Sequence, residues 1–559
     1  MSSLNSPAEN LTDSGLSVPD DNQDSFSLID LAIDLSLKHS AGISIDERKK
    51  IGQIFTPKET AMFMAGFVNI NPGKSNISGC DNNSGMAEFS LMDPGSGTGN
   101  LLSAVCQRIL NEAYSPMNIR VDAFECDTLV IPSLKQVLDS CRNSLEAEGH
   151  RFQFNIIDED FILHNEQYLE KGSLFREENL FYYDAVISNP PYYKINKQSS
   201  QAAIMKDFLS GQPNIYGLFM ALSAHMVKDS GDIIFVTPRS FCSGLYYRKV
   251  RNWFIKNTCI HWIHNFESRK NRFLNDSILQ ENVIVHAVKT KAEMCHSSLI
   301  SSSYDNLFTD VHQIAVPYKD LIFNRDDENI IRIPTSETEL KIIELVDSWK
   351  YTLSDFGLRM STGPVVDFRT KENLRENYSE GKDAPLLWMQ NLQGEEIIWP
   401  VEGLKKPQAI EVNPTTDSIL LPVKNYVLIK RFTSKEQKRR LSATSLLKED
   451  FSNYGMIGFE NHLNYIHRPK GSLSEDETFG LTAFLNTKLI DLYFRAMNGN
   501  TQVNASEINI LPIPEISFIT DIGSKFRELK EISLANPDEI VGNILGIDND
   551  LIKSLKYRS

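Results

Sequence analysis

Strand-like apolar segments recur about every 32 residues between residues 88 and 188, and this spacing constrains the fold more than any other feature of the chain. The segments begin near Glu88, Ile119, Arg151 and Tyr183. Residues 101–113 and 131–147 lie between them and are predicted to be helices. A strand, a helix and their turns fill roughly 30 residues, so the pattern is typical of βα units that build a parallel sheet.

Three further strands are predicted at residues 232–237, 260–266 and 282–289. Together with the first four they make a seven-strand, doubly wound α/β sheet. Ligands bind to such sheets at the carboxyl ends of the strands, near the point where the strand order reverses. We therefore expect a ligand site among the residues that follow the first four strands.

The first strand ends in a glycine-rich turn, Asp93-Pro94-Gly95-Ser96-Gly97-Thr98-Gly99-Asn100. Glycines at a strand-to-helix turn let a ligand approach the backbone, although a lone loop of this kind is weak evidence for any one cofactor. The spacing differs from the dinucleotide and triphosphate motifs. Asp93 would repel a pyrophosphate but suits a cation, such as the amino group of S-adenosylmethionine (AdoMet).

Acidic residues also follow the next two strands. Glu125 ends the second strand, where an acid typically pairs with ribose hydroxyls. Asp160 and Phe161 follow the third, where they would bond to and pack against an adenine base. Singly, each acid could be a turn residue or a helix N-cap, but the three at successive strand ends form a series that fits a nucleoside.

The fourth strand ends in Asn189-Pro190-Pro191-Tyr192. The prolines have a fixed φ and no N–H, so the carbonyls around them are held in place. The Asn189 side-chain oxygen and a neighbouring backbone carbonyl can together accept both hydrogens of a planar NH₂ group, and the Tyr192 ring offers a face for a flat substrate. The alternative is a proline-rich turn capped by asparagine.

These motifs resemble the gamma class of N6-adenine DNA methyltransferases, the modification enzymes of type II restriction–modification systems. The resemblance covers residues 48 to 515 and includes Gly52-Gln53-Ile54-Phe55-Thr56-Pro57. It implies an AdoMet-dependent, Rossmann-like methyltransferase domain followed by an α+β target-recognition domain. The implied cofactor-binding residues are Phe55, Thr56, Pro57, Asp93, Gly95, Gly97, Gly99, Glu125, Asp160 and Phe161, and the implied catalytic residues are Asn189, Pro190, Pro191 and Tyr192.

Further segments extend the resemblance. Residues 216–219 and 234–241 are similar to the next two motifs of the family. Residues 272–284 are similar to the segment that supplies a second aromatic side chain, which places Phe273, with Phe266 as the alternative, against a target base sandwiched by Tyr192. Residues 498–507 are similar to a stretch of the recognition domain, which favours DNA over the other substrates of such loops.

The charge distribution adds a candidate DNA contact. The net charge is −16, and residues 1–45 hold seven acids and one lysine. Residues 424–448 instead hold eight basic residues and one acid, a local charge of +7. We expect this run to face phosphates, although a solvated helix face is the simpler interpretation. The expected DNA-binding residues are Lys430, Arg431, Lys438, Arg439 and Arg440.

The apolar runs and the spacing of the cysteines give the expectations for localisation and thiol chemistry. No apolar run approaches the roughly 20 residues that span a bilayer, and no signal sequence is apparent, so we expect a cytoplasmic monomer with no membrane contact. The seven scattered cysteines predict reduced thiols, neither disulfides nor zinc ligands. The predicted segments are a disordered acidic lead (1–25), a helical extension (26–47), the catalytic domain (48–334), the recognition domain (335–515) and a helical C-terminal segment (516–559).

AdoMet is the one cofactor expected, with no metal. Double-stranded DNA is the expected partner, and a cognate restriction endonuclease would act independently. Two alternatives stay open: methylation of another planar amine, namely cytosine N4, an RNA base or a protein glutamine, and a catalytically silent DNA-binding protein. Cytosine C5 chemistry is disfavoured because no Pro-Cys nucleophile is present.

Overall fold

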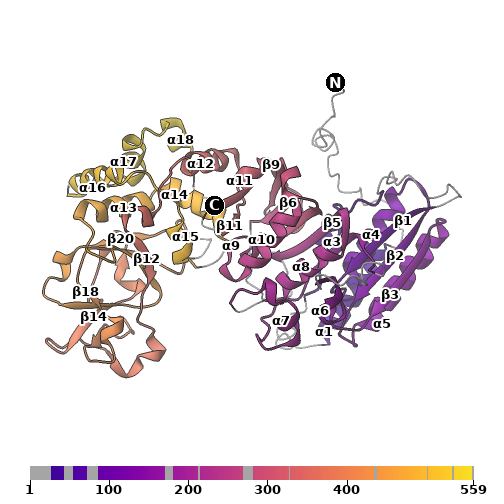
Figure 1. Ribbon diagram of the computed structural model, residues 1–559, viewed down its shortest axis with the longest axis horizontal. Helices are drawn as coiled ribbons and strands as arrows, with labels where there is room; N and C mark the ends of the chain where they lie inside the picture. The colour runs from indigo at the N-terminus through magenta and orange to yellow at the C-terminus, as the bar shows by residue number, and fades with distance from the viewer. Residues whose placement is uncertain are drawn as a thin grey trace.

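The computed structural model describes residues 27–42, 54–71, 86–169, 180–211, 214–267, 281–325, 328–433, 437–499, 502–531 and 534–556. These residues form two lobes that lie side by side (Figure 1). The lobe coloured indigo to magenta holds the N-terminal half of the chain, and the orange and yellow lobe holds the C-terminal half. The predicted acidic lead at residues 1–25 lies outside the described residues.

A nine-stranded sheet is the centre of the first lobe. Its strands lie in the order β3 (Arg151–Ile157), β2 (Met117–Phe124), β1 (Ala87–Asp93), β4 (Tyr183–Ser188), β5 (Val227–Pro238), β7 (Asn282–Lys289), β6 (Thr258–Phe266), β8 (Ser297–Ser303) and β9 (His312–Pro317). The first five strands in this order pair in parallel, and β7 is antiparallel to both β5 and β6. The predicted seven-strand, doubly wound sheet is confirmed, and β8 and β9 extend it.

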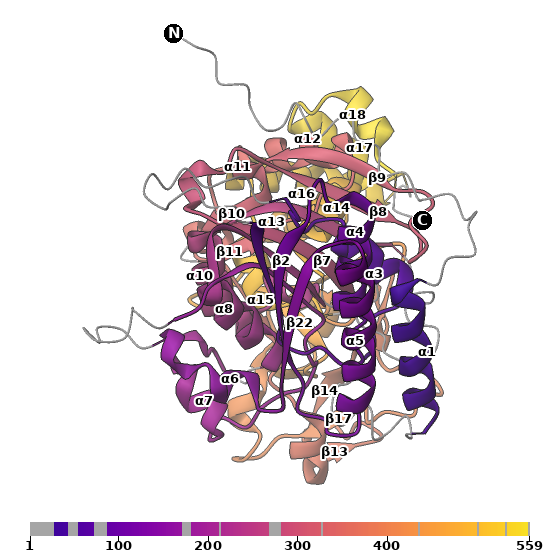
Figure 2. The same cartoon turned by 90° about the vertical axis from the view of Figure 1, so that its right-hand side faces the viewer.

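The sheet is covered by helices on both faces, so its central strands β4 and the second half of β5 are almost fully buried. One face packs against α1 (Leu28–Ala41), α3 (Lys58–Ala65), α4 (Asn100–Glu112) and α5 (Ile131–Ala147). The other packs against α8 (Ile215–Met226), α9 (Ser240–Ser243) and α10 (Arg248–Asn257). Figure 2 shows the two groups of helices on opposite sides of the strands. Alternating residues of one strand serve the two cores: Ile234 faces the first group and Phe235 the second.

The second lobe contains a four-stranded sheet, a five-stranded sheet and a two-stranded sheet of β15 (Leu392–Gln393) and β16 (Glu396–Ile397). The four-stranded sheet has the order β12 (Arg359–Thr362), β22 (Leu463–His467), β19 (Tyr426–Lys430) and β20 (Ala443–Leu446). The five-stranded sheet has the order β13 (Leu374–Arg375), β17 (Ala409–Glu411), β14 (Asp383–Leu387), β21 (Met456–Phe459) and β18 (Leu421–Pro422). The lobe is therefore α+β: β12 and β20 of the four-stranded sheet lie beside its helices, and β14 and β18 of the five-stranded sheet lie farther from them (Figure 1).

Helices close the second lobe. They are α12 (Glu337–Asp347), α13 (Glu475–Leu485), α14 (Lys488–Met497), α15 (Ala505–Asn509), α16 (Ile516–Glu531), α17 (Pro537–Ile544) and α18 (Asn549–Ser554). Phe526 of α16 and Val541 of α17 share one core with Phe484 and Tyr493 of α13 and α14. The C-terminal helices are thus packed into the lobe. None of the described helices is long and apolar enough to cross a membrane.

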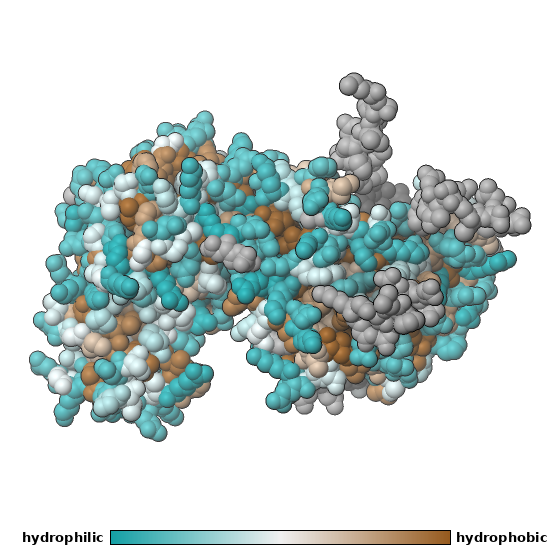
Figure 3. Space-filling model, viewed as in Figure 1, coloured by the Kyte–Doolittle hydropathy of each residue, from teal (hydrophilic) through white to brown (hydrophobic). Residues whose placement is uncertain are grey.

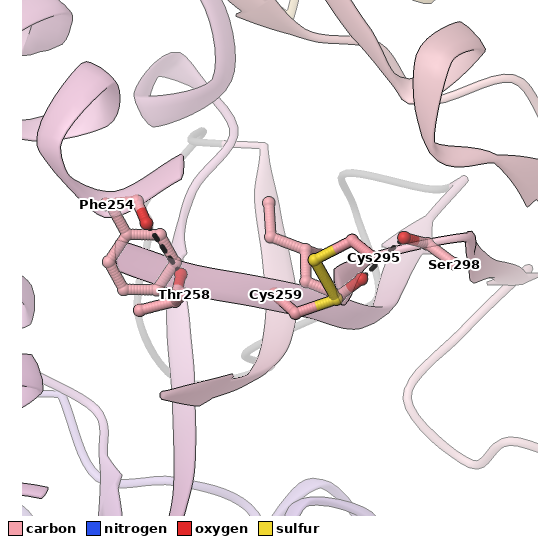
Figure 4. Close-up of a disulfide and its surroundings, with 6 residues drawn as sticks. Phe254, Thr258, Cys259, Cys295 and Ser298 are labelled. Atoms are coloured by element: carbon pink, nitrogen blue, oxygen red, sulfur yellow. Dashed lines mark hydrogen bonds between the residues drawn. A yellow bond between two sulfur atoms is a disulfide. The ribbon is translucent and has the colours of Figure 1, made fainter. Parts of the chain in front are cut away.

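One cysteine pair differs from the prediction of free thiols. Cys259 in β6 is disulfide-bonded to Cys295, which precedes β8, with their Cα atoms 5.7 Å apart (Figure 4). The prediction was wrong for this pair because β6 and β8 pair in parallel, which brings the beginnings of the two strands together. Cys106, Cys126, Cys141 and Cys242 are free, and Cys80 lies outside the described residues.

Helices α13 and α16 approach each other so closely that only glycine fits at two of their positions. A Cβ atom added to Gly480 would lie 1.9 Å from the Ile519 carbonyl oxygen. One added to Gly523 would lie 1.8 Å from the Asp476 carbonyl oxygen. Because both contacts are to backbone, a side-chain rotation cannot relieve them.

We predict that Gly523→Ala lowers the free energy of unfolding by about 1–3 kcal/mol or more, as overpacking of a tight interface does. Gly455→Ala is the matched control, because its added Cβ would meet no atom within 4 Å, and we expect a change of less than about 0.5 kcal/mol. Urea unfolding of the two variants measures the difference. Equal stability of the two would contradict this packing.

Candidate active site

The predicted site residues meet at the carboxyl edge of β1 and β4. Strand β1 is flanked by β2 on one side and β4 on the other, so the strand order reverses here. A Cβ atom at Gly95, after β1, would lie 3.9 Å from Cδ of Pro191 and 4.0 Å from the Asn189 carbonyl oxygen, after β4. The glycine-rich turn and the Asn-Pro-Pro-Tyr loop are therefore in contact, as expected from their places in the sheet.

Two glycines of the turn adopt a left-handed backbone. Gly97 has a φ of 53° and Gly99, the N-cap of α4, has a φ of 88°. A Cβ at Gly97 would lie 3.1 Å from the ring of Phe55, and one at Gly99 would lie 3.1 Å from Cδ1 of Leu134. Any other residue would be strained and crowded here, so the turn keeps its backbone open toward the site.

The acids Asp93 and Glu125 lie on either side of this turn. Asp93 is 1% exposed, and its Oδ1 accepts the Gly95 N–H at 3.1 Å. The two carboxylate oxygens of Glu125 accept N–H groups from Gly97 and Asp127, both at 2.8 Å. Burial raises the pKa of Asp93 to about 7, against the lowering effect of the Gly95 hydrogen bond, and burial also raises the pKa of Glu125. Both carboxylates would ionise more readily beside a bound cation.

Asp160 and Phe161 have clear roles in the fold. Asp160 is the N-cap of α6 (Phe161–His164): its Oδ1 accepts the N–H groups of Ile162 and Leu163, and its Oδ2 accepts Gln201 Nε2 at 2.9 Å. The Phe161 ring is buried and packs edge-on against Phe124 at 5.2 Å. Their predicted adenine contact stays a prediction.

Phe219 is an aromatic side chain that sequence reasoning did not single out. Its Cε1 lies 4.0 Å from the position of a Cβ at Gly95, and its ring centroid lies 4.9 Å from that of Phe161. It comes from α8, within the segment 216–219 that already suggested a family motif. Phe219 follows Tyr216 by three residues, and in a helix this spacing places two side chains on the same face, which was the available signal.

The segment Ile54–Pro57 connects the cofactor loop to the catalytic loop. Asn100, the first residue of α4, donates from Nδ2 to the Thr56 carbonyl at 2.8 Å. Asn189 donates from Nδ2 to the Ile54 carbonyl at 2.9 Å and lies 3.2 Å from Thr56 Oγ1. Two amide side chains that are 89 positions apart thus hold the same short segment, and Phe55 lies over Gly97.

The second half of the Asn189 amide faces Tyr192. The Tyr192 hydroxyl lies 2.7 Å from Asn189 Oδ1 and 3.0 Å from the Val236 carbonyl oxygen at the end of β5. The Tyr192 ring packs edge-on against Tyr216, with centroids 5.9 Å apart. Burial raises the pKa of Tyr192, so the hydroxyl stays protonated and donates.

The residues present fit AdoMet. The left-handed glycines leave the backbone uncovered by Cβ atoms, the buried Asp93 carboxylate would suit an amino group, and the half-buried Glu125 carboxylate would suit ribose hydroxyls. No group of three or more His, Cys, Asp or Glu side chains is arranged to hold a metal among the residues that the structure describes.

The second predicted stacking residue, Phe273, lies outside the described residues. Its alternative, Phe266, is 3% exposed and packs against His264 and Phe308 in the core. Phe266 is therefore enclosed by protein on the face that α3 covers.

The basic run does not form a helix face, because it spans β19 and β20. Lys430 and Arg431 are half-buried, and Arg431 donates to the Asn461 carbonyl at 3.0 Å. Arg440 differs from the expectation: it is 2% exposed and donates to Asn498 Oδ1 at 3.1 Å. Its guanidinium is enclosed by protein and does not present itself to a phosphate. Lys438 is exposed and Arg439 is half-buried.

Comparisons with known proteins identify the family of the chain. Residues 119–273 match the Eco57I restriction-modification methylase family. The type II methyltransferase M.PstI of Providencia stuartii is 34% identical over 518 residues, which cover 91% of this chain and 96% of that protein. The type II methyltransferase M.BsuBI of Bacillus subtilis is 33% identical over 480 residues, which cover 86% of this chain and 90% of that protein.

Among solved structures, the type IIL restriction-modification enzyme MmeI in complex with DNA aligns with a TM-score of 0.48 and 13% identity, covering 94% of this chain and 76% of that one. The family is decided by the two curated relatives, whose similarity runs through both lobes. S-adenosylmethionine is the cofactor expected of a methylase family. The chain belongs to the type II methyltransferases of restriction–modification systems represented by M.PstI and M.BsuBI, and it is a DNA methyltransferase.

Proposed function

We propose that this enzyme transfers the methyl group of AdoMet to N6 of an adenine that is flipped out of double-stranded DNA at a specific site. The modified site would be protected from a cognate restriction endonuclease that acts independently. The enzyme would work as a cytoplasmic monomer. The observation that carries the proposal is the orientation of the Asn189 amide.

The Asn189 amide has one defined acceptor. Because Nδ2 is hydrogen-bonded to Ile54 and Thr56, Oδ1 must be the atom that faces Tyr192 and the end of β4. This assignment follows from the hydrogen-bond network. Oδ1 has two lone pairs, so it can accept a substrate N–H in addition to, or in place of, the Tyr192 hydroxyl. The acceptor therefore exists before substrate binds.

Asn189 Oδ1 and the Pro190 carbonyl oxygen would form a pair of acceptors that suits an aromatic amine. The lone pair of adenine N6 is delocalised into the ring, so the amine is a poor nucleophile. Hydrogen bonds from its two N–H groups to Asn189 Oδ1 and the Pro190 carbonyl would favour a more tetrahedral nitrogen and stabilise the positive charge that develops on it. Bound AdoMet supplies the electrophilic methyl group: in direct in-line transfer the bond from N6 to the methyl carbon would form as the carbon–sulfur bond breaks, the sulfur would leave as the neutral thioether of S-adenosylhomocysteine, and N6 would lose one proton to solvent. No covalent enzyme intermediate is needed.

Adenine N6 cannot be reached inside a duplex, so the base must leave the stack. Tyr192 would receive it on its ring, with Phe273 on the opposite side, each contact stabilising the flipped base by roughly 1–3 kcal/mol. Asp93 and Glu125 would hold the amino group and the ribose of AdoMet. To bind the adenine of the cofactor, Asp160 Oδ2 would have to give up the hydrogen bond that it accepts from Gln201.

The two-lobed shape supports a DNA substrate. Figure 3 shows the surface hollowed between the lobes, below the elements that join them. We propose that DNA lies there and that the first lobe is the catalytic lobe and the second the recognition lobe. The four- and five-stranded sheets of the recognition lobe would lie near base edges. The basic residues near phosphates would be Lys430, Arg431, Lys438 and Arg439. Arginine and amide side chains read base edges, whereas lysines mostly hold phosphates.

We predict that Asn189→Ala lowers kcat at least about 100-fold, because it removes an acceptor that stabilises developing charge. Tyr192→Ala should lower it similarly through loss of base stacking. AdoMet affinity should fall by no more than about 30-fold, since the two hydrogen bonds from Asn189 Nδ2 to the Ile54–Pro57 segment contribute about 1 kcal/mol each. The assay is transfer of labelled methyl from AdoMet to duplex DNA, followed by identification of the methylated base.

Asn196→Ala is the matched control for that experiment, because Asn196 is exposed and its side chain accepts a local bond from the Gln198 N–H. It should transfer methyl at the wild-type rate. Wild-type activity in Asn189→Ala would remove the catalytic loop from the mechanism, and a label on cytosine N4, RNA or protein would identify the alternative substrate.

We predict that AdoMet affinity falls as the pH is lowered through 7. The free-enzyme pKa of Asp93 is raised to about 7, and the cationic amino group of AdoMet needs the carboxylate, so binding releases a proton below this pH. The ionised fraction falls from about 0.75 at pH 7.5 to about 0.1 at pH 6, which implies roughly an eightfold weaker Kd. Calorimetry at both pH values measures it. Asp93→Asn should bind weakly at both, and a pH-independent wild-type Kd would contradict the role of Asp93.

We predict that Lys438→Gln with Arg439→Gln weakens DNA binding and reduces the slope of log K against log salt by about 2, one unit for each phosphate that the double variant no longer neutralises. The matched control is Lys553→Gln with Lys556→Gln, two exposed lysines at and just beyond α18. An unchanged slope in the first double variant would mean that this run is an ordinary solvated surface.

A further inference from the structure

A buried arginine at the end of β5 joins the two lobes. Arg239 is 3% exposed and donates from Nη2 to the Arg495 carbonyl at the end of α14, at 2.7 Å. Its aliphatic part lies under Gly499, where an added Cβ would be 2.3 Å from Arg239 Cγ. The backbone of Arg495 and Gly499 in the recognition lobe thus packs against this one side chain of the catalytic lobe.

Arg239 also holds the start of β7. Its N–H donates to the Glu281 carbonyl at 2.6 Å, and its Nη1 lies 3.7 Å from Glu281 Oε2. Glu281 is 7% exposed and follows the segment in which Phe273 lies. One residue therefore connects β5, β7 and α14.

Buried charges surround this connection. The interface buries three arginines and three carboxylates: Arg239, Arg440, Arg495, Glu281, Asp491 and Glu507. Asp491 accepts Arg495 Nε at 2.7 Å and the Arg440 N–H at 2.6 Å. Removing water from charges is costly unless they are paired, and here Arg239 pairs with Glu281 in the first lobe while Arg495 pairs with Asp491 in the second. Separating the lobes would break the bond from the buried Arg239 guanidinium to the Arg495 carbonyl.

The segment that ends at Arg239 is also the one that positions Tyr192. The Val236 carbonyl oxygen lies 3.0 Å from the Tyr192 hydroxyl. Ser240, the next residue after Arg239, lies 2.9 Å from the Tyr216 hydroxyl through its Oγ, and the Tyr216 ring packs on that of Tyr192. Two contacts of Tyr192 thus lead to residues 236–240.

We propose that Arg239 is a positioning residue, through which the docking of the recognition lobe sets the place of Tyr192 and hence of Asn189 Oδ1. The role in turnover rests on the proposed function. Arg239 acts without touching substrate. It fixes the end of β5 so that the catalytic acceptor is aligned only when the recognition lobe is seated.

The test compares two perturbations of this contact with one elsewhere in the interface. Arg239→Gln removes the donor, and Gly499→Ala displaces Arg239 without changing any charge. Arg325→Gln is the matched control, because Arg325 Nη1 donates across the interface to the Ile510 carbonyl at 3.3 Å but lies on β10 (Ile322–Arg325), away from β5.

Both test variants should lower kcat roughly 10- to 100-fold, as small misplacements of reacting groups do, with KM for AdoMet and Kd for DNA changed less than about threefold. The control should keep its kcat. Unchanged kcat in a folded Gly499→Ala, or an equal loss in Arg325→Gln, would overturn the proposal.

A second measurement does not depend on the substrate. Amide hydrogen exchange of the free enzyme should rise in peptides that cover residues 189–193 and 236–240 in both test variants and stay unchanged in the control. A rise spread over the whole interface, or none at residues 189–193, would overturn the coupling. If the wild type failed to methylate adenine, the proposed function would fall while hydrogen exchange still decided the coupling.

Discussion

The site depends on the hydrogen bonds made by one side-chain amide. Asn189 Nδ2 donates to the Ile54 carbonyl, and this bond joins the segment beside the glycine-rich turn to the Asn-Pro-Pro-Tyr loop. The same bond leaves Oδ1 facing the Tyr192 hydroxyl, where it would accept the amine of the proposed substrate. Cofactor cover and substrate acceptor are thus fixed by a single planar group, which cannot rotate without losing both.

Burial gives the remaining groups their chemical properties. Asp93 is held in a dry position where its charge is costly, and a cation that arrives there recovers part of that cost. Burial keeps the Tyr192 hydroxyl protonated, so it can donate to Asn189 Oδ1 or to the Val236 carbonyl oxygen. At the interface between the lobes the buried charges are instead paired within the protein, so they stabilise the contact and are not available to bind a ligand.

Local patterns in the sequence predicted the first lobe well. The bounds of β4, β7 and α5 coincide with those expected, because apolar periodicity and turn residues are local signals. The pairing of β8 with β6, the disulfide and the burial of Arg440 were not foreseen. Each depends on contacts between distant residues: Arg440 is held by Asp491, 51 positions away, and a basic residue looks the same in the sequence whether it is buried or exposed. The second stacking aromatic falls where the structure describes no residues.

We propose above all that the Asn189 acceptor serves adenine N6 in DNA. The decisive experiment is sequencing of genomic DNA from cells that express the chain, with single-base detection of modified bases. We expect N6-methyladenine at one short recurring sequence and at no other. Methylation of cytosine N4 at such a sequence, or unmodified DNA from cells with abundant folded enzyme, would contradict it.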